Sequence, residues 1–179
     1  MRVCVFCGAR AGRDGRYLAL AQEVGRAIVA RGDGVVYGGG RVGMMGALAD
    51  AALAAGGNVV GVIPRALATA EVAHGGISEL HVVDSMHARK ALLTEIGDAF
   101  IALPGGIGTM DELFEALTWR QLGIHDKPVG ILNSFGYYDA LVALLDRMFE
   151  EALLPAGTRA FVSIDDDIGD LLRKLHRDG

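Results

Sequence analysis

Residues 99–122 read AFIALPGGIGTMDELFEALTWRQL, and this stretch decides the fold. Its first residues form an apolar run of strand length, which predicts a strand over Ala99–Leu103. A glycine-rich segment follows, and from Met110 to Leu122 the apolar residues recur at helical spacing. The stretch therefore predicts a strand, a glycine-rich loop and a helix in direct succession.

The same order of elements repeats along the chain. The predicted strands are Val3–Cys7, Gly34–Tyr37, Asn58–Ile63, Leu80–Val83, Ala99–Leu103, Val129–Leu132 and Phe161–Ser163. The predicted helices lie near Tyr17–Ala30, Met44–Ala55, Met86–Ile96, Met110–Leu122, Tyr137–Ala152 and Ile168–His176. Because strands separated by helices pair in parallel through right-handed crossovers, we expect an α/β fold. Residues 1–179 should form a single doubly wound, Rossmann-like domain, with a mostly parallel sheet, helices on both faces and ligands at the carboxyl ends of the strands.

Composition and charge narrow the class of protein. Of the 179 residues, 51% are hydrophobic but only 6% aromatic, so the core is built from Ala, Val, Leu and Ile, as in buried parallel strands. A net charge of −5 gives no basic surface for nucleic acid. No apolar run reaches the roughly 20 residues that span a bilayer. We expect a cytoplasmic protein with no nucleic-acid or membrane partner.

Neither a metal nor a cofactor is expected. Cys4 and Cys7 form a CxxC pattern, but residues three apart in a strand point to opposite faces, so we expect two separate buried thiols. The histidines show no metal-ligand spacing, and no G-x-S-x-G motif indicates a serine hydrolase. A pyridoxal enzyme needs a Schiff-base lysine, and Lys90, Lys127 and Lys174 lie in no recognisable cofactor setting.

A first glycine-rich loop, Gly38–Gly46, follows the second predicted strand. It contains a GxGxxG pattern, in which glycine amides can approach an anion closely at a helix N-terminus. Gly39, Gly40 and Gly43 are therefore candidate phosphate-binding residues. An NAD(P)-dependent oxidoreductase is an alternative, but the next strand ends without the acidic ribose-binding residue that such a site carries.

The second glycine-rich loop offers a more specific site. Gly105, Gly106 and Gly108 can present successive amides to phosphate oxygens, and the Thr109 hydroxyl adds a donor. Thr109-x-x-Glu112 also matches a capping box, in which Glu112 only satisfies a backbone amide. Negative charge beside an anion-binding loop weakens phosphate binding, however, and this conflict favours a functional Glu112.

A pair of cations precedes this loop in the chain. Arg89 and Lys90 lie near the predicted start of a helix, where the helix dipole disfavours positive charge. A bound anion would relieve that cost. The alternative is a solvated basic pair on an exposed helix face.

Together these segments resemble the LOG ("lonely guy") family of cytokinin riboside 5'-monophosphate phosphoribohydrolases, once widely mislabelled lysine decarboxylases. The resemblance covers nearly the whole chain. The segments that carry it are Phe6-Cys7-Gly8, Gly38–Gly46, Glu71-Val72-Ala73-His74, Ser85-Met86-His87-Ala88-Arg89-Lys90, Pro104–Glu112 and Thr118–Gly123 with Lys127-Pro128. It implies hydrolysis of the N-glycosidic bond of AMP or an N6-substituted AMP, giving free base and ribose 5-phosphate.

The resemblance also implies roles for single residues. Arg89 and Glu112 would be the catalytic pair, with Lys90 assisting and Glu71 and Thr118 contacting the nucleotide. The residues that would hold phosphate and ribose are Gly105, Gly106, Ile107, Gly108, Thr109, Met110 and Asp111. The family is dimeric, which implies a homodimer with the helix around Trp119 at or near the subunit contact, although ordinary core packing of Trp119 is the alternative. Ala9-Arg10 departs from the serines of many relatives, and Asp111 replaces a usual Glu.

The expected reaction assigns a task to each member of the catalytic pair. Breaking the C1'–N9 bond builds positive charge on the ribose, which a carboxylate near C1' stabilises while it activates water. We expect Arg89 to bind the phosphate or the ribose hydroxyls and to keep Glu112 ionised by lowering its pKa. A non-catalytic carrier of nucleotide or molybdenum cofactor is the alternative function. Loop residues 64–76 are expected to line the pocket for the base. The sequence does not predict the path of this loop, so it does not identify the preferred base.

Overall fold

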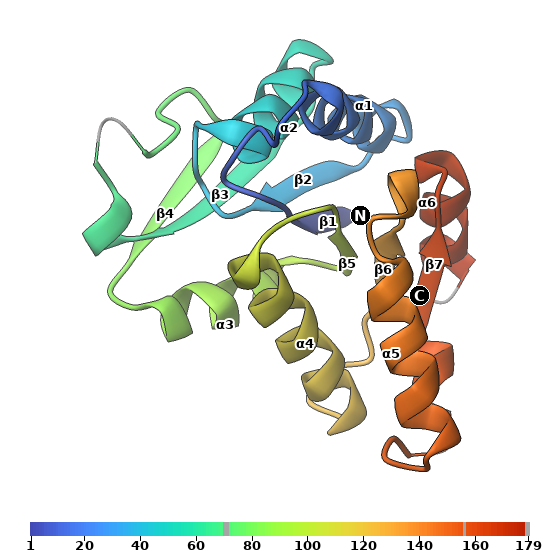
Figure 1. The fold of residues 1–179 in the computed structure, drawn as a ribbon. Helices are drawn as coiled ribbons and strands as arrows, with labels where there is room; N and C mark the ends of the chain where they lie inside the picture. Colours follow the sequence, from blue (N-terminus) through green and yellow to red (C-terminus); the bar gives the residue numbers. More distant parts are fainter. Residues whose placement is uncertain (70–71, 156, 178–179) are drawn as a thin grey trace.

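A parallel seven-stranded sheet runs through the centre of the molecule (Figure 1). The computed structural model describes residues 1–69, 72–155 and 157–177. The strands follow the order β4-β3-β2-β1-β5-β6-β7, and all pairings between them are parallel. Their bounds are β1 Arg2–Phe6, β2 Gly34–Tyr37, β3 Val59–Pro64, β4 Glu79–Val83, β5 Ala99–Ala102, β6 Val129–Leu132 and β7 Val162–Asp165. The expected α/β class and parallel sheet are confirmed.

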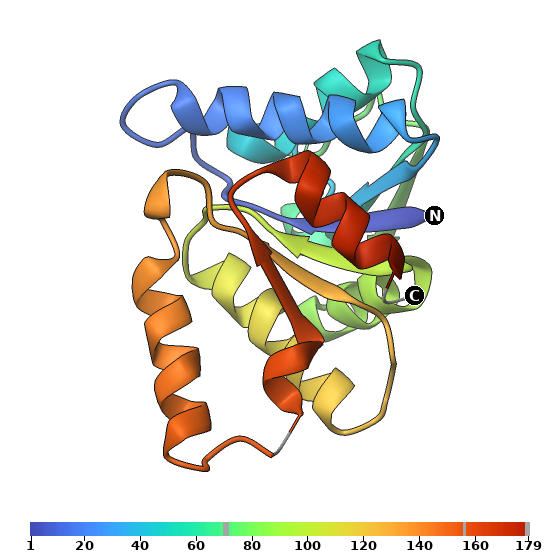
Figure 2. The ribbon, with the colours of Figure 1, turned by 90° about the vertical axis from the view of Figure 1, so that its right-hand side faces the viewer.

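Helices cover both faces of this sheet. Their bounds are α1 Arg16–Ala30, α2 Gly43–Ala54, α3 Met86–Ile96, α4 Ile107–Gln121, α5 Asp139–Glu150 and α6 Ile168–Arg177, with short 3₁₀ turns at η1 Arg65–Leu67, η2 Ser134–Gly136 and η3 Thr158–Phe161. Buried residues of α1, α2 and α6 share one core cluster, and those of α3, α4 and α5 share the other. In Figure 2, blue α1 and orange α5 accordingly lie on opposite sides of the strands.

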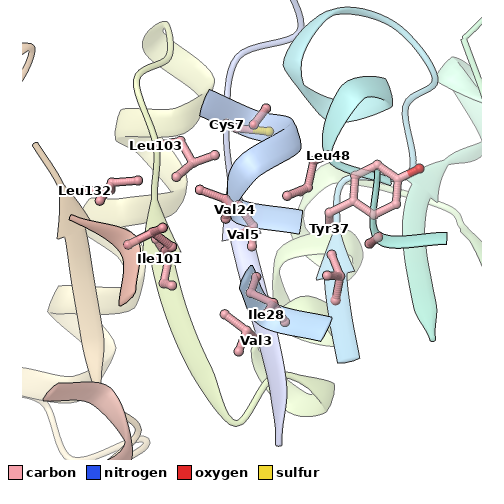
Figure 3. Packing of buried hydrophobic residues seen from close by; sticks show 14 of the residues in the cluster. Val3, Val5, Cys7, Val24, Ile28, Tyr37, Leu48, Ile101, Leu103 and Leu132 are labelled. Atoms are coloured by element: carbon pink, nitrogen blue, oxygen red, sulfur yellow. The ribbon is translucent and has the colours of Figure 1, made fainter. Parts of the chain in front are cut away.

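Alternation along β1 supplies both core layers. Val3 and Val5 pack with α1 and α2, as Figure 3 shows, whereas Phe6 packs with the opposite layer. Cys7 lies in the first layer and Cys4 in the second, so the predicted divergence of the two buried thiols is confirmed. Burial raises the pKa of both thiols well above the ordinary value.

The strand order reverses between β1 and β5, which are neighbours in the sheet. From β1 the chain proceeds outward through β2 and β3 to β4, then returns to β5 and proceeds the other way. The loops that follow β1, β2 and β5 therefore meet at one edge of the sheet. In an open parallel sheet this reversal point is the usual place for a ligand.

Several helix and strand starts differ from the sequence expectation by one to three residues, and those of α4, α5 and β7 have a local reason. Helix α4 begins at Ile107 instead of Met110, because Gly106 is its N-cap and Thr109 already lies within the first turn. Helix α5 begins at Asp139 instead of Tyr137, because Tyr137 and Tyr138 continue the turn after η2 and Tyr138 is the N-cap. Strand β7 begins at Val162 because Phe161 ends the turn η3. Within the described ranges no helix is long and apolar enough to cross a membrane.

Candidate active site

A cleft of about 490 Å³ opens at the reversal point of the sheet. One part of its wall is polar and comes from α3, the loop after β5 and the start of α4. The described residues of this part are Arg89, Gly105, Gly106, Gly108, Thr109 and Glu112. Another part is apolar and comes from α2 and from the segment at and after the end of β3, through Met44, Met45, Ile63, Leu67 and Val72. The cleft thus pairs a site for charged groups with a surface for an apolar or planar group.

Arg89 and Glu112 form an ion pair inside this cleft. The Arg89 Nη1 atom lies 3.1 Å from Glu112 Oε1, and the two side chains are only 12% and 10% exposed. The Arg89 guanidinium is also held by backbone carbonyls, since Nε donates to Val62 O at 3.1 Å and Nη2 to Gly38 O at 3.4 Å. A Cβ atom at position 38 would overlap Arg89 Nη2, so a glycine there leaves space for the guanidinium.

Local structure brings these two side chains from different helices. Ser85 caps α3 by accepting a hydrogen bond from the Ala88 amide at 3.1 Å, which places Arg89 in the first turns of that helix. Glu112 lies in the second turn of α4, past the N-cap Gly106, and no side chain caps that helix. The capping box considered from the sequence is therefore wrong, because Glu112 reaches across to α3 instead of back to its own backbone.

Two opposing influences set the pKa of Glu112. Burial raises the pKa of this carboxyl, and the nearby Arg89 guanidinium lowers it only in part, so the net pKa lies above the ordinary value. The expected lowering of this pKa by the Arg89 cation is confirmed, but the larger effect of burial, which the expectation did not include, outweighs it. A carboxyl with a raised pKa is more basic, which suits proton abstraction from water.

Lys90 is not part of the cleft lining. Its Nζ atom lies 2.8 Å from Glu115 Oε2 and 3.1 Å from Asp111 Oδ2, both on α4. The hydrogen bond to Glu115 is the largest influence on its pKa, which is raised above the ordinary value. The adjacent cations of α3 are therefore neutralised by three carboxylates of α4, and this resolves the charge conflict that each helix shows when its sequence is considered alone.

Two consecutive tyrosines hold the glycine-rich loop in place. Tyr138 Oη donates a hydrogen bond to Leu103 O, and Tyr137 Oη donates one to Gly105 O, each at 2.5 Å. Tyr138 is buried beneath the loop, whereas Tyr137 lines the cleft. The connection between β6 and α5 thereby holds the carbonyl groups of Leu103 and Gly105 in place. Fixed carbonyls leave the amides at the start of α4 oriented before a ligand arrives.

The structure brings together only some of the predicted site residues. Those that line the cleft are Gly40, Arg89, Gly105, Gly106, Gly108, Thr109 and Glu112. Those that lie outside its lining are Gly39, Gly43, Lys90, Ile107, Met110, Asp111 and Thr118. Glu71 lies outside the described residues. Where the chain is described, no group of three or more His, Cys, Asp or Glu side chains is placed to hold a metal ion.

Comparison with known proteins agrees with this arrangement. A family model described as "Possible lysine decarboxylase" matches residues 45–175. The cytokinin riboside 5'-monophosphate phosphoribohydrolase of Rhodococcoides fascians is 53% identical over 167 residues, which cover 93% of this chain and 84% of the relative. A phosphoribohydrolase of the same kind from Arabidopsis thaliana is 44% identical over 174 residues, which cover 97% and 82%. The chain belongs to the LOG family.

Solved structures share the fold of this LOG-family chain. The molybdenum cofactor carrier protein of Chlamydomonas reinhardtii matches with a TM-score of 0.75 and 21% identity, over 99% of this chain and 96% of that one. The molybdenum cofactor binding protein of Rippkaea orientalis matches with a TM-score of 0.75 and 21% identity, over 98% and 95%. At such low identity the likeness shows the fold alone.

The cleft of this LOG-family chain also contains residues that sequence reasoning missed. Arg10 was noted only as a departure from relatives, and Met44, Met45 and Tyr137 were not proposed as site residues, yet all four line the cleft. A usable signal exists for Arg10, which follows the end of β1 by a few residues, and for the two methionines, which open α2 directly after a glycine-rich loop. Tyr137 has no such signal, because it follows β6 at a distance in sequence from the loop that it contacts.

Proposed function

We propose that this chain hydrolyses the N-glycosidic bond of AMP or of an N6-substituted AMP, releasing the free base and ribose 5-phosphate. The observation that carries the proposal is the buried Arg89–Glu112 pair in a cleft that begins at a glycine-rich helix N-terminus. LOG relatives of 44–53% identity carry the name of this activity. The enzyme is accordingly an N-glycosyl hydrolase that acts on a small-molecule nucleotide.

Glu112 is the residue proposed to act on the reacting atoms. As the C1'–N9 bond lengthens, the ribose ring gains positive charge, and a carboxylate near C1' stabilises that charge. The raised pKa makes Glu112 a better base toward the attacking water, although it must be ionised to act. Arg89 orients the carboxylate through the 3.1 Å contact. Two backbone carbonyls accept hydrogen bonds from Arg89 and hold it in position.

The glycine-rich loop after β5 is proposed to bind the 5'-phosphate and ribose. Gly105, Gly106, Gly108 and Thr109 line the cleft at the N-terminus of α4, where free amides and the helix dipole favour an anion. Gly40 adds a second glycine-rich edge from the loop after β2. The apolar wall on the other side then receives the base. We propose no metal or cofactor in this reaction.

A carrier of nucleotide or molybdenum cofactor is the second candidate function. The solved structures with the same fold include molybdenum cofactor carrier and binding proteins. A carrier has no need of a buried carboxylate that is paired with an arginine inside the ligand cleft, because burial of such a pair is costly. The hydrolase is therefore the better account of this cleft.

Product analysis separates the two functions. The purified chain is incubated with AMP, with N6-isopentenyl-AMP and with adenosine, and released base and ribose 5-phosphate are measured by chromatography. The hydrolase releases base and ribose 5-phosphate in equal amounts from at least one of the two nucleotides. A carrier binds nucleotide and releases no base. The ratio of the two kcat/KM values then identifies the preferred base.

The remaining parts of the proposal concern the assembly. We propose that residues 1–179 act as one nucleotide-binding unit and that the chain forms a homodimer in the cytoplasm. Sedimentation equilibrium at several concentrations tests the dimer, and fractionation of the source cells tests the location. A monomer at all concentrations would contradict the first part, and recovery with membranes would contradict the second.

A further inference from the structure

Three charged side chains line the cleft in the described chain, and two of them neutralise each other. These residues are Arg10, Arg89 and Glu112. Arg89 is committed to Glu112 and to two backbone carbonyls, so its positive charge and its donors are largely used. Lys90 pairs with Asp111 and Glu115 outside the lining. Arg10 therefore carries a positive charge that no acidic side chain of the described cleft lining neutralises.

Arg10 lies where the two glycine-rich loops come together. The Gly8 amide donates to Pro104 O at 3.4 Å, which joins the segment after β1 to the loop after β5. On the other side this segment abuts Gly43, the first residue of α2, which has a φ of +60°; a Cβ atom there would overlap the Ala9 carbonyl. The segment that contains Arg10 thereby lies beside the starts of α2 and α4, which both contribute residues to the cleft.

The Arg10 guanidinium has hydrogen-bond donors that the described residues do not use. Within residues 1–69, 72–155 and 157–177 it makes no hydrogen bond or ion pair, and its side chain is exposed. Its neighbours on the same segment differ. Arg16 pairs with Asp14 and stacks on the rings of Tyr17 and Phe135, and Arg13 is not part of the cleft lining.

We propose that Arg10 binds the 5'-phosphate of the nucleotide and sets the preference of the cleft for phosphorylated over unphosphorylated nucleosides. A phosphate monoester carries a charge of about −1.5 to −2 near pH 7, and a guanidinium can contact two of its oxygens at once. The amides of the glycine-rich loop orient the phosphate, and Arg10 supplies the net charge that they lack. The inference rests on the proposed function for the identity of the substrate.

Binding measurements test this role independently of turnover. Dissociation constants of ribose 5-phosphate and adenosine are measured by calorimetry for the unaltered chain, for Arg10→Ala, for Arg10→Lys and for the control Arg13→Ala. A charge-assisted contact predicts that Arg10→Ala weakens ribose 5-phosphate binding about 10- to 100-fold. Arg10→Lys recovers part of this loss, because it keeps the charge without the two-oxygen contact. Adenosine binding and the Arg13→Ala variant stay within about twofold of the unaltered chain.

The kinetic counterpart uses the same variants with AMP. Arg10→Ala raises KM by a similar factor and changes kcat by less than about threefold, since the contact is made in the ground state as well as in the transition state. Equal affinity of Arg10→Ala and the unaltered chain for ribose 5-phosphate would overturn the inference, as would an equal loss for adenosine. Failure of the unaltered chain to release base from both AMP and N6-isopentenyl-AMP overturns the proposed function instead, and the binding results with ribose 5-phosphate still decide the role of Arg10.

Discussion

The carboxylate of Glu112 lies 3.1 Å from the guanidinium of Arg89, on a different helix and with nearly the whole of both side chains removed from solvent. Burying two opposite charges costs several kcal/mol each before their attraction offsets the loss. The Val62 and Gly38 carbonyls offset part of this cost for Arg89. The pair thus joins α3, α4 and the ends of β2 and β3 at one point in the cleft, and its properties determine how the site responds to pH and to substitution.

The raised pKa of Glu112 predicts an acid limb in the activity profile. Glu112 acts as a carboxylate, so activity falls as pH falls through its pKa. Because burial raises that pKa, protonation occurs at a higher pH than for a solvent-exposed glutamate. In a plot of log kcat/KM against pH, measured with AMP, activity should begin to fall on the acid side at a pH above the ordinary pKa range of glutamate. The profile of kcat, which reports groups in the enzyme–substrate complex, is measured beside it so that the ionisation of free AMP does not contribute. A limb at or below the ordinary range contradicts the prediction.

Removing Arg89 should damage both stability and catalysis. Arg89→Gln leaves the Glu112 carboxylate buried without a cation, which costs about 3–5 kcal/mol when a buried pair is broken. The acid limb should also move to higher pH, since the one neighbour that most lowers the Glu112 pKa is lost. Urea unfolding and the pH profile measure the two effects.

A matched double variant separates pairing from general damage. Arg89→Gln combined with Glu112→Gln should be more stable than the sum of the single losses predicts, because it leaves neither charge alone. Additive losses in the cycle would show that the two side chains do not interact in solution.

The two tyrosines that hold the glycine-rich loop should differ in their effects. Tyr137→Phe removes the bond to Gly105 O at the cleft and should raise KM for AMP about 3- to 10-fold, in line with the loss of one hydrogen bond. Tyr138→Phe removes a buried bond to Leu103 O and should lower the free energy of unfolding by about 1–3 kcal/mol, because the carbonyl is left unsatisfied. Reversed effects on KM and unfolding would show that the loop is fixed by other contacts.

The contact of Lys90 with α4 predicts a structural role for this residue. Lys90→Met should reduce stability while KM for AMP changes by less than about twofold, since the ammonium group pairs with Glu115 and Asp111 and is not part of the cleft lining. A double-mutant cycle with Glu115→Gln should give a coupling of about 1 kcal/mol or more in unfolding, because the pair is largely buried. A large rise in KM for Lys90→Met, without a change in stability, would place Lys90 on the substrate.

Local patterns were sufficient to predict the architecture of this protein. Apolar runs alternate with helical spacing from Val3 to the C-terminal helix, and the predicted strands and helices match the observed elements to within a few residues. The same patterns place Arg89 and the Gly105–Gly108 loop at the carboxyl edge of the sheet, because every β-to-α loop of a parallel sheet opens there. The location of the site could therefore be predicted before any contact was known.

Contacts between distant elements could not be predicted in this way. Adjacent Arg89 and Lys90 pair with different carboxylates of α4, and only the placement of α3 relative to α4 decides which of them enters the cleft. The net pKa of Glu112 depends on burial that no local pattern gives. Tyr137 contacts Gly105, which lies 32 positions away in the sequence. This contact depends on how the sheet places two distant loops side by side, and no local pattern predicts it.

The hydrolysis of AMP by Glu112→Gln tests the central claim most directly. Glutamine keeps the size of the side chain but removes the charge and the base, so the variant should bind AMP with a Kd within about fivefold of the unaltered chain and release adenine at least about 10³-fold more slowly. Calorimetry with AMP and chromatography of released adenine provide the two numbers. Adenine release at the unaltered rate, with AMP still bound, would contradict the account.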